Sequence, residues 1–304
     1  MTAFEKARTF VYRNARPLDL AIWQYHFENG SKEGVMHALS AYQNPDGGFG
    51  HGLEADNFNP NSAPMQTWKA ANIIDGIGFE GEHPVILGML RYMESGADFD
   101  NDKRQWLNTV PSNNDYPHAI WWEYKEGEVE FKYNPTAALA AFILLHSPKN
   151  SPLYNKAIDI TGEALEYYCS PDTEPEQHVT SCYIELYNAL KKADITAFDL
   201  YKLRSAISSN MDKLICRDTS KWGKEYVSLP STFIIGTDSE FISGYEDLCL
   251  AECELIINYQ LPDGSYNVPW QWCTPYKEFT LAENWWKSII TTNNTLFLRN
   301  MNKF

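Results

Sequence analysis

The residues best suited to chemistry stand in a glycine-rich segment near the start of the chain: His51, Glu54 and Asp56. Two carboxylates in different surroundings can serve as general acid and general base. The same three side chains also offer the oxygen and imidazole ligands of a metal site. Loop carboxylates also commonly cap helices or bind loop amides. A structural role of this kind is therefore an alternative to catalysis and metal binding.

Two aromatic clusters outside the clear helical stripes are candidate substrate-binding surfaces. Tryptophan rings stack on sugars, contact polyenes and stabilise cations over the ring face. The alternative is that they fill space between helices, because large aromatic side chains contribute burial first. The predicted binding residues are His118, Trp121, Trp122 and Glu123 in the first cluster, and Trp270, Trp272 and Trp285 in the second.

The elements that must position these residues are helices. Ile86, Met89, Leu90 and Met93 follow the i, i+3, i+4, i+7 spacing of an amphipathic helix, and several other segments do the same. Polar segments rich in Gly and Pro separate the helices, with short strands expected at 131–133 and 224–228. Further helices are expected at 17–28, 32–43, 135–146, 152–169, 242–259 and 276–299.

An internal repeat is the strongest single feature of the sequence. Residues 42–49 read YQNPDGGF and residues 259–266 read YQLPDGSY, with five identities in eight positions. Pro-Asp-Gly is turn chemistry, because Pro presets φ and Gly supplies a positive φ. The Gln before each turn is placed to bind backbone groups at a helix end. Repeated helix–turn units must stack or close on each other to bury their apolar faces.

These two segments resemble the repeats of terpenoid cyclases and of protein prenyltransferase β subunits. The resemblance implies an all-α fold, a single α/α toroid over residues 1–304 with two rings of helices and short loop strands. Residues 47–56, GGFGHGLEAD, also resemble a group of uncharacterised bacterial proteins placed near that superfamily. The implied activity is chemistry on an isoprenoid-like substrate in an aromatic-lined central cavity.

The catalytic motifs of those families are missing, however. The chain has neither the Asp-x-Asp-Asp acid of class II cyclases nor the Asp-Asp-x-x-Asp magnesium motif of class I synthases. The prenyltransferase zinc pattern survives only as Asp247 and Cys249, with no later His to complete it. We therefore expect no cofactor. These two residues remain weak candidates for zinc, and magnesium stays a further alternative.

Composition excludes several function classes. The formal net charge is −15, from 25 basic and 40 acidic residues, which disfavours nucleic acid and anionic membranes as partners. The longest apolar run, residues 137–145, is shorter than the roughly 20 residues of a membrane span. Residues 1–6 lack the apolar segment of a secretion signal, and the six cysteines form no disulfide pattern. We expect a cytoplasmic protein with reduced thiols.

Three functions fit these observations. The first is an enzyme that acts on an isoprenoid-like or other hydrophobic substrate by acid/base catalysis. The second is a carbohydrate-active hydrolase or lyase, since helical toroids also host such enzymes and a carboxylate pair across an aromatic cleft suits a neutral sugar. The third is a non-catalytic binding module. Either enzyme would take a small-molecule substrate.

Overall fold

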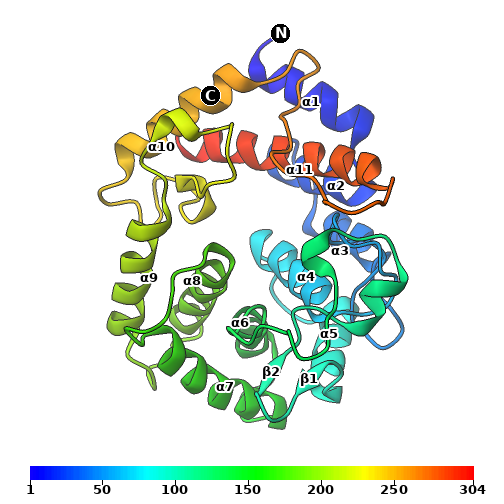
Figure 1. Ribbon diagram of the computed structural model, residues 1–304, viewed down its shortest axis with the longest axis vertical. Helices are drawn as coiled ribbons and strands as arrows, with labels where there is room; N and C mark the ends of the chain where they lie inside the picture. The colour runs from blue at the N-terminus through cyan, green and yellow to red at the C-terminus, as the bar shows by residue number, and fades with distance from the viewer. The chain divides into compact units, whose positions relative to one another are not determined.

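The computed structural model describes residues 1–304 and is built almost entirely of helices (Figure 1). The all-α fold class predicted from the sequence is confirmed. Strands β1 (Phe99–Asp100) and β2 (Gln105–Trp106) pair antiparallel in one small ribbon. The helices are α1 (Ala3–Asn14), α2 (Pro17–Phe27), α3 (Lys32–Ser40), α4 (Pro64–Gly76), α5 (Pro84–Ser95), α6 (Thr136–His146), α7 (Pro152–Tyr168), α8 (Gln177–Lys192), α9 (Leu200–Leu214), α10 (Glu246–Tyr259) and α11 (Phe279–Asn300).

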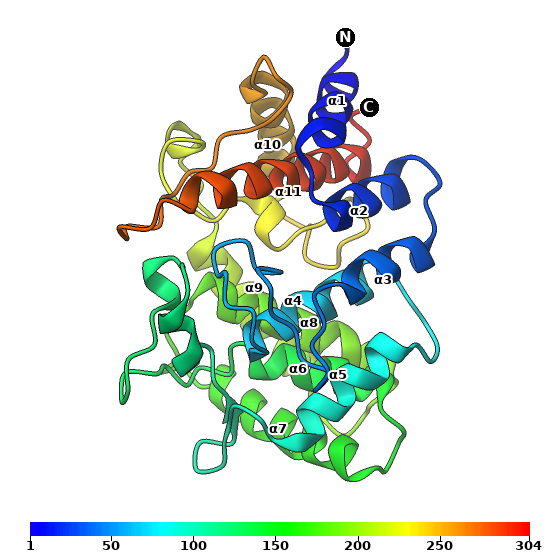
Figure 2. The same cartoon turned by 90° about the vertical axis from the view of Figure 1, so that its right-hand side faces the viewer.

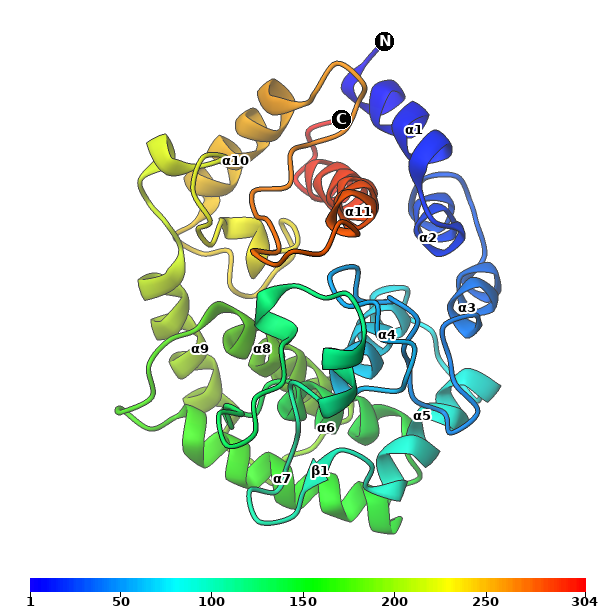
Figure 3. The same cartoon turned by 45° about the vertical axis from the view of Figure 1, so that its right-hand side comes forward.

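The chain forms two compact units. Unit 1 comprises residues 1–39 and 214–304, and unit 2 comprises residues 40–213. Unit 1 therefore contains both chain ends, and α11 lies against α1 and α2 there (Figure 2). In unit 2, α6 is the central helix, and α4, α5, α7 and α8 pack around it (Figures 1 and 3).

The central place of α6 follows from its composition. Every residue from Thr136 to Leu144 is buried, so the helix has no polar face to present to water. Four of its side chains are Ala, which lets neighbouring helices approach closely. The Thr136 hydroxyl accepts a hydrogen bond from the Trp106 amide at 2.9 Å and so attaches β2 to this helix. No helix of the chain combines the length and apolarity that a bilayer crossing requires.

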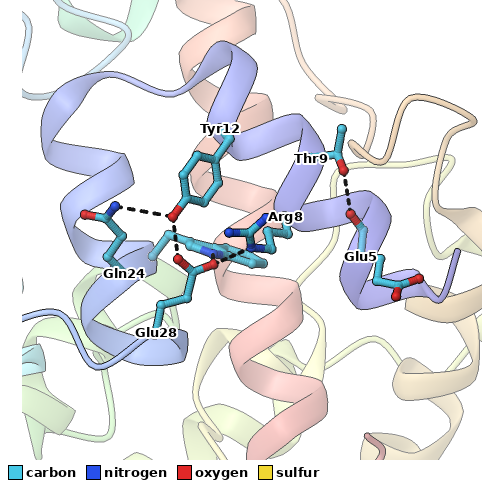
Figure 4. A network of polar contacts seen from close by, with 7 residues as sticks. Glu5, Arg8, Thr9, Tyr12, Gln24 and Glu28 are labelled. Carbon is cyan, nitrogen blue, oxygen red and sulfur yellow. Dashed lines mark hydrogen bonds and ion pairs between the residues drawn. The ribbon is translucent and has the colours of Figure 1, made fainter.

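A polar network joins α1 to α2 in unit 1 (Figure 4). The Glu28 carboxylate accepts hydrogen bonds from Arg8 Nε at 2.7 Å, from Trp23 Nε1 at 3.1 Å and from the Tyr12 hydroxyl. These donors come from both helices, and Glu28 follows directly after the end of α2. Its pKa is lowered because the hydrogen bonds and the positive charge outweigh the opposing effect of burial.

A buried ion pair orders the start of α2. Arg16 Nε and Nη2 donate to the two carboxylate oxygens of Asp19 at 2.7 and 3.2 Å, and both residues are less than a tenth exposed. The Arg16 guanidinium also lies over the Trp285 ring of α11, 5.0 Å from the ring centroid. This two-point contact satisfies a charge that would otherwise be costly to bury.

We expect Arg16→Ala to lower the free energy of unfolding by about 3 kcal/mol, because it leaves the Asp19 carboxylate buried without its cation. The double variant Arg16→Leu with Asp19→Leu should be close to wild type, since apolar residues can replace a buried pair at little cost. Denaturant unfolding of the three proteins measures both values. Equal losses in the single and double variants would show that the carboxylate does not depend on Arg16.

The first Pro-Asp-Gly corner follows α3 and is locked onto α5. Gln43 Nε2 donates to the Gly47 carbonyl within the turn and to the Val85 carbonyl at the start of α5, both at 2.9 Å. Gly47 has a φ of +97°, and a Cβ atom there would lie 2.0 Å from the Gly88 carbonyl oxygen. The Asp46 carboxylate closes the turn by accepting the Gly48 amide at 2.9 Å.

The second corner follows α10 and repeats this geometry on α1. Gln260 Nε2 donates to the Gly264 carbonyl at 3.1 Å and to the Ala3 carbonyl at 2.9 Å. Gly264 has a φ of +98°, and a Cβ atom there would lie 2.2 Å from the Lys6 carbonyl oxygen. In both copies the Gln binds one carbonyl near the helix start and the Gly contacts the carbonyl three residues later.

The two corners show which helix each Gln binds. Each Gln was expected to bind free backbone groups at a helix end. It binds a carbonyl in the first turn of a different helix, 42 residues away for Gln43 and 257 residues away for Gln260. Each copy of the repeat thus joins the end of one helix to the start of another. This shared junction accounts for the Gln, Asp and Gly that are identical in the two copies.

Candidate active site

The loop after the first corner lies beside the first aromatic cluster in unit 2. The Ala119 amide donates to the Asp56 carbonyl at 2.9 Å, and Asn57 forms an antiparallel bridge with His118. Asp56 and His118 are both buried, with 2% and 4% of their surface exposed. The structure therefore brings these two predicted site residues into one backbone pairing.

His51 and Glu54 make contacts within their own loop. His51 is exposed, adopts a φ of +60°, and its Nε2 lies 2.9 Å from Asn44 Oδ1. Glu54 is half-buried, and its carbonyl accepts the Asn57 amide at 3.0 Å. These contacts order the loop, and the catalytic role predicted for His51, Glu54 and Asp56 stays a prediction.

A buried amide network, which the sequence did not suggest, holds this loop. Asn59 is fully buried, and its Nδ2 donates to Ser112 Oγ at 2.8 Å and to Asn113 Oδ1 at 3.0 Å. Asn57 Nδ2 donates to the same Asn113 oxygen at 3.0 Å. Gln66 of α4 reaches the Asn59 carbonyl at 3.0 Å. Paired amides of this kind give the loop one conformation, because an unpaired buried amide would be costly.

The remaining residues of the first cluster lie closer to solvent. Trp121 is 42% exposed and Trp122 is half-buried. Glu123 is half-buried and pairs with Lys125 at 3.3 Å. Their predicted contact with substrate stays a prediction.

The second aromatic cluster belongs to unit 1 and its members differ in burial. Trp272 is 1% exposed and packs beside Phe279, which is the environment of a core residue. Trp270 is half-buried and meets the Trp286 ring edge-on, with centroids 5.1 Å apart. Trp285 is half-buried under the Arg16 guanidinium. Of the three predicted binding residues, Trp270 and Trp285 thus retain a solvent-facing surface.

The two weak metal candidates do not share a surface. Asp247 is exposed at the start of α10, whereas Cys249 is fully buried. Burial raises the pKa of the Cys249 thiol to about 12, which disfavours the thiolate that zinc needs. No group of three His, Cys, Asp or Glu side chains in the chain is arranged to hold a metal ion.

A carboxyl group that the sequence analysis missed stands out in unit 2. Trp68 Nε1 of α4 donates to Glu185 Oε2 of α8 at 2.9 Å. With the Asn72 amide oriented to satisfy its neighbours, its nitrogen donates to both Glu185 oxygens at 3.0 and 3.1 Å. The Glu185 residue as a whole is half-buried.

The surroundings of Glu185 favour its neutral form. Burial raises its pKa to about 8, the negative charge of Asp75 adds to the rise, and Trp68, Asn72 and Lys69 oppose it. The raised pKa favours the protonated form at neutral pH. A carboxylic acid with a pKa near the working pH is well matched to proton donation.

Local sequence explains how this group is positioned. In α8, Val179, Cys182 and Leu186 form the buried stripe of the helix, and Glu185 lies at its edge. In α4, Ala70, Ala71 and Ile74 are buried while Trp68 and Asn72 lie one turn apart beside them. The apolar stripes pack into the unit, and the polar side chains meet where the stripes end.

An acid–base pair lies further along α4. His146 at the end of α6 places its Nε2 3.0 Å from Asp75 Oδ1. The His146 ring also packs on Phe142, with ring centroids 4.3 Å apart. Carboxylate, imidazole and neutral carboxyl groups thus occur along one helix face, which is the set of groups that proton-transfer enzymes use.

A second carboxyl group with a raised pKa, that of Glu252 in unit 1, can be compared with Glu185. It is 1% exposed, and Ser231 donates to both of its oxygens, through the amide at 2.9 Å and the hydroxyl at 2.5 Å. Burial raises its pKa to about 7. These two bonds anchor the 3₁₀ turn Pro230–Thr232 to α10. Glu185 differs in that its residue as a whole is half-buried, whereas Glu252 is buried.

Comparison of the chain with protein-family models, curated proteins and solved structures finds no match in any of the three. The chemistry of the site rests on its own geometry.

Proposed function

We propose that this protein is an enzyme in which Glu185 acts as general acid on a neutral, mainly apolar substrate. The observation that carries the proposal is a carboxyl group held in one orientation by Trp68 and Asn72, in a half-buried residue, with a pKa that burial raises to about 8. A fixed proton donor of this kind contributes roughly 10²- to 10⁴-fold to a rate.

An isoprenoid-like substrate is the first candidate. Protonation of a carbon–carbon double bond creates a carbocation, and the face of an indole ring stabilises such a charge. Trp68 lies directly beside the proposed acid. This substrate class agrees with the resemblance of the repeats to the terpenoid cyclase and prenyltransferase-like superfamily, in its uncharacterised bacterial branch, and with the expected cytoplasmic location.

The proposal includes closure of the helices into one α/α toroid. It is supported by the two corners, which repeat one helix-to-helix junction at distant places in the chain. The second junction joins the end of α10, in the last part of the chain, to the start of α1.

A carbohydrate is the second candidate, because the acid has a charged carboxylate near it. Asp75 is close enough for its charge to raise the pKa of Glu185. Glycosidases use two carboxyl groups whose environments push their protonation states apart. An indole ring such as that of Trp68 is also a stacking surface for a sugar.

Turnover assays with farnesol and with a panel of 4-nitrophenyl glycosides test the proposal. We expect wild type to convert one of these probe classes, and Glu185→Gln to lower its kcat by about 100-fold or more. Glu252→Gln is the matched control, because it removes the other carboxyl group with a raised pKa. This variant should retain the kcat of wild type. Glu54→Gln and Asp56→Asn test the site predicted from the sequence. Full turnover in folded Glu185→Gln would refute the role of Glu185.

A further inference from the structure

One face of α4 carries a polar stripe that connects three helices. Trp68, Asn72 and Asp75 are spaced i, i+4, i+7, so their side chains lie on one side of the helix. The first two bind Glu185 of α8, and the third binds His146 of α6. The stripe thus aligns a neutral acid and an imidazole along one helix.

The imidazole of His146 is held in a defined way. Its Nε2 is 3.0 Å from Asp75 Oδ1, and its side chain is 9% exposed. The other ring nitrogen, Nδ1, is neither hydrogen-bonded to the protein nor fully buried. Because a carboxylate accepts only from an N–H group, the neutral ring carries its hydrogen on Nε2. Nδ1 then has a lone pair available to accept a proton.

The residues that hold the two groups are close together on α4. Asn72, which binds the acid, and Asp75, which binds the imidazole, are three residues apart, or about 4.5 Å along the helix axis. The acid and the imidazole are therefore held from positions within one turn of the same helix.

We infer that His146 is the general base that works with Glu185, and that Asp75 positions it; this inference rests on the proposed function. The geometry places an anchored imidazole and an anchored carboxyl on neighbouring helices that contact one stripe. Asp75 acts through its two neighbours: it orients the imidazole, and its negative charge favours the protonated form of the acid.

The pair specifies a class of reaction in which a substrate gains one proton and loses another. The Glu185 carboxyl proton adds to one carbon of a carbon–carbon double bond, and the other carbon becomes a cation. His146 Nδ1 then removes a proton from a neighbouring carbon, and that C–H electron pair forms the new double bond. Glu185 is left as carboxylate and His146 as imidazolium, and proton exchange through solvent restores both. The product is an isomer of the substrate, and no oxidant or metal takes part.

The link between Asp75 and the acid can be tested without a substrate. Carbon-13 NMR of the Glu side-chain carboxyl groups, assigned with Glu185→Gln, gives the titration midpoint of Glu185. Asp75→Asn should lower this midpoint by about one pH unit, because a nearby negative charge is removed. Asp172→Asn, an exposed carboxylate of the same unit, is the control and should leave it unchanged. An unchanged midpoint in Asp75→Asn would overturn the positioning role.

The role of His146 as base is tested by turnover with the probe that wild type converts. We expect His146→Gln to lower kcat by about 100-fold and to abolish the acidic limb of the pH–rate profile. Asp75→Asn should lower kcat and move the basic limb, which Glu185 sets, to lower pH, which a purely structural residue would not do. Should His146→Gln retain both kcat and the acidic limb while Glu185→Gln is inactive, this inference fails and the proposed function stands. Should Glu185→Gln stay active, the proposed function fails.

Discussion

Gly47→Ala is expected to lower the free energy of unfolding by about 2–5 kcal/mol. Two costs add. An Ala at a φ of +97° costs roughly 1–2 kcal/mol in the left-handed region. The new Cβ would also lie 2.0 Å from the Gly88 carbonyl oxygen, so α5 must move away from the corner and break the bond from Gln43 to Val85. Denaturant unfolding measures the loss.

Gly96→Ala is the matched control for this prediction. Gly96 also has a positive φ, +75°, but a Cβ there would meet no atom within 4 Å. Its cost should be the conformational part alone, about 1–2 kcal/mol. Gly264→Ala should resemble Gly47→Ala, because its Cβ would lie 2.2 Å from the Lys6 carbonyl oxygen. If all three substitutions cost the same, the close approach at the corners contributes nothing.

The corners show what local sequence can predict. Pro-Asp-Gly defines its turn within a few residues, so both turns were predicted correctly from the chain alone. The helix that each corner binds is distant in sequence, and nothing in residues 42–49 specifies Val85. The predicted helix 32–43 ends early, at Ser40, because Tyr42 and Gln43 belong to the corner. Tertiary contact decides that boundary.

The short strands illustrate the same limit. Segments 131–133 and 224–228 were the candidates for short strands, yet the ribbon forms from Phe99–Asp100 and Gln105–Trp106. Of the expected strand residues, Ser228 makes only an isolated bridge with Ile215. β-Propensity describes how a side chain fits a half-buried surface, so it identifies no strand until the partner is known.

The site was harder to predict than the fold. In the sequence, His51, Glu54 and Asp56 stand out as candidates because they are close together in the chain. Glu185 is separated from Trp68 by 117 residues, and its hydrogen bonds appear only when α4 and α8 pack on α6. The sequence did contain one signal of this site, the spacing of Trp68, Asn72 and Asp75 on α4. These residues form a polar stripe beside the buried apolar residues of the same helix.

The stability of Glu185→Gln relative to wild type is expected to increase with pH. The difference in free energy of unfolding, variant minus wild type, should be about 3 kcal/mol larger at pH 8 than at pH 5.5. The pKa of Glu185 is about 8 in the folded protein against 4.5 as its ordinary value. Between these values the native state holds a proton that the unfolded state has released. Wild-type stability therefore falls with rising pH in this window, by up to about 1.4 kcal/mol per unit for this group.

The difference between variant and wild type isolates this effect. Other groups also titrate here: burial lowers the pKa of His26 to about 4 and raises that of Glu252 to about 7. Both are present in the two proteins, so their contributions cancel in the difference, because distant sites act additively. Unfolding by denaturant at half-unit steps from pH 5 to 8.5 gives the curve. For Glu252→Gln, the difference in free energy of unfolding from wild type should rise with pH at a similar slope. That rise should stop near pH 7, since the pKa of Glu252 is lower than that of Glu185.

A difference between Glu185→Gln and wild type that is flat from pH 5 to 8.5 would mean that the Glu185 carboxyl is ionised in the native protein. It would remove the proton donor on which the proposed chemistry depends.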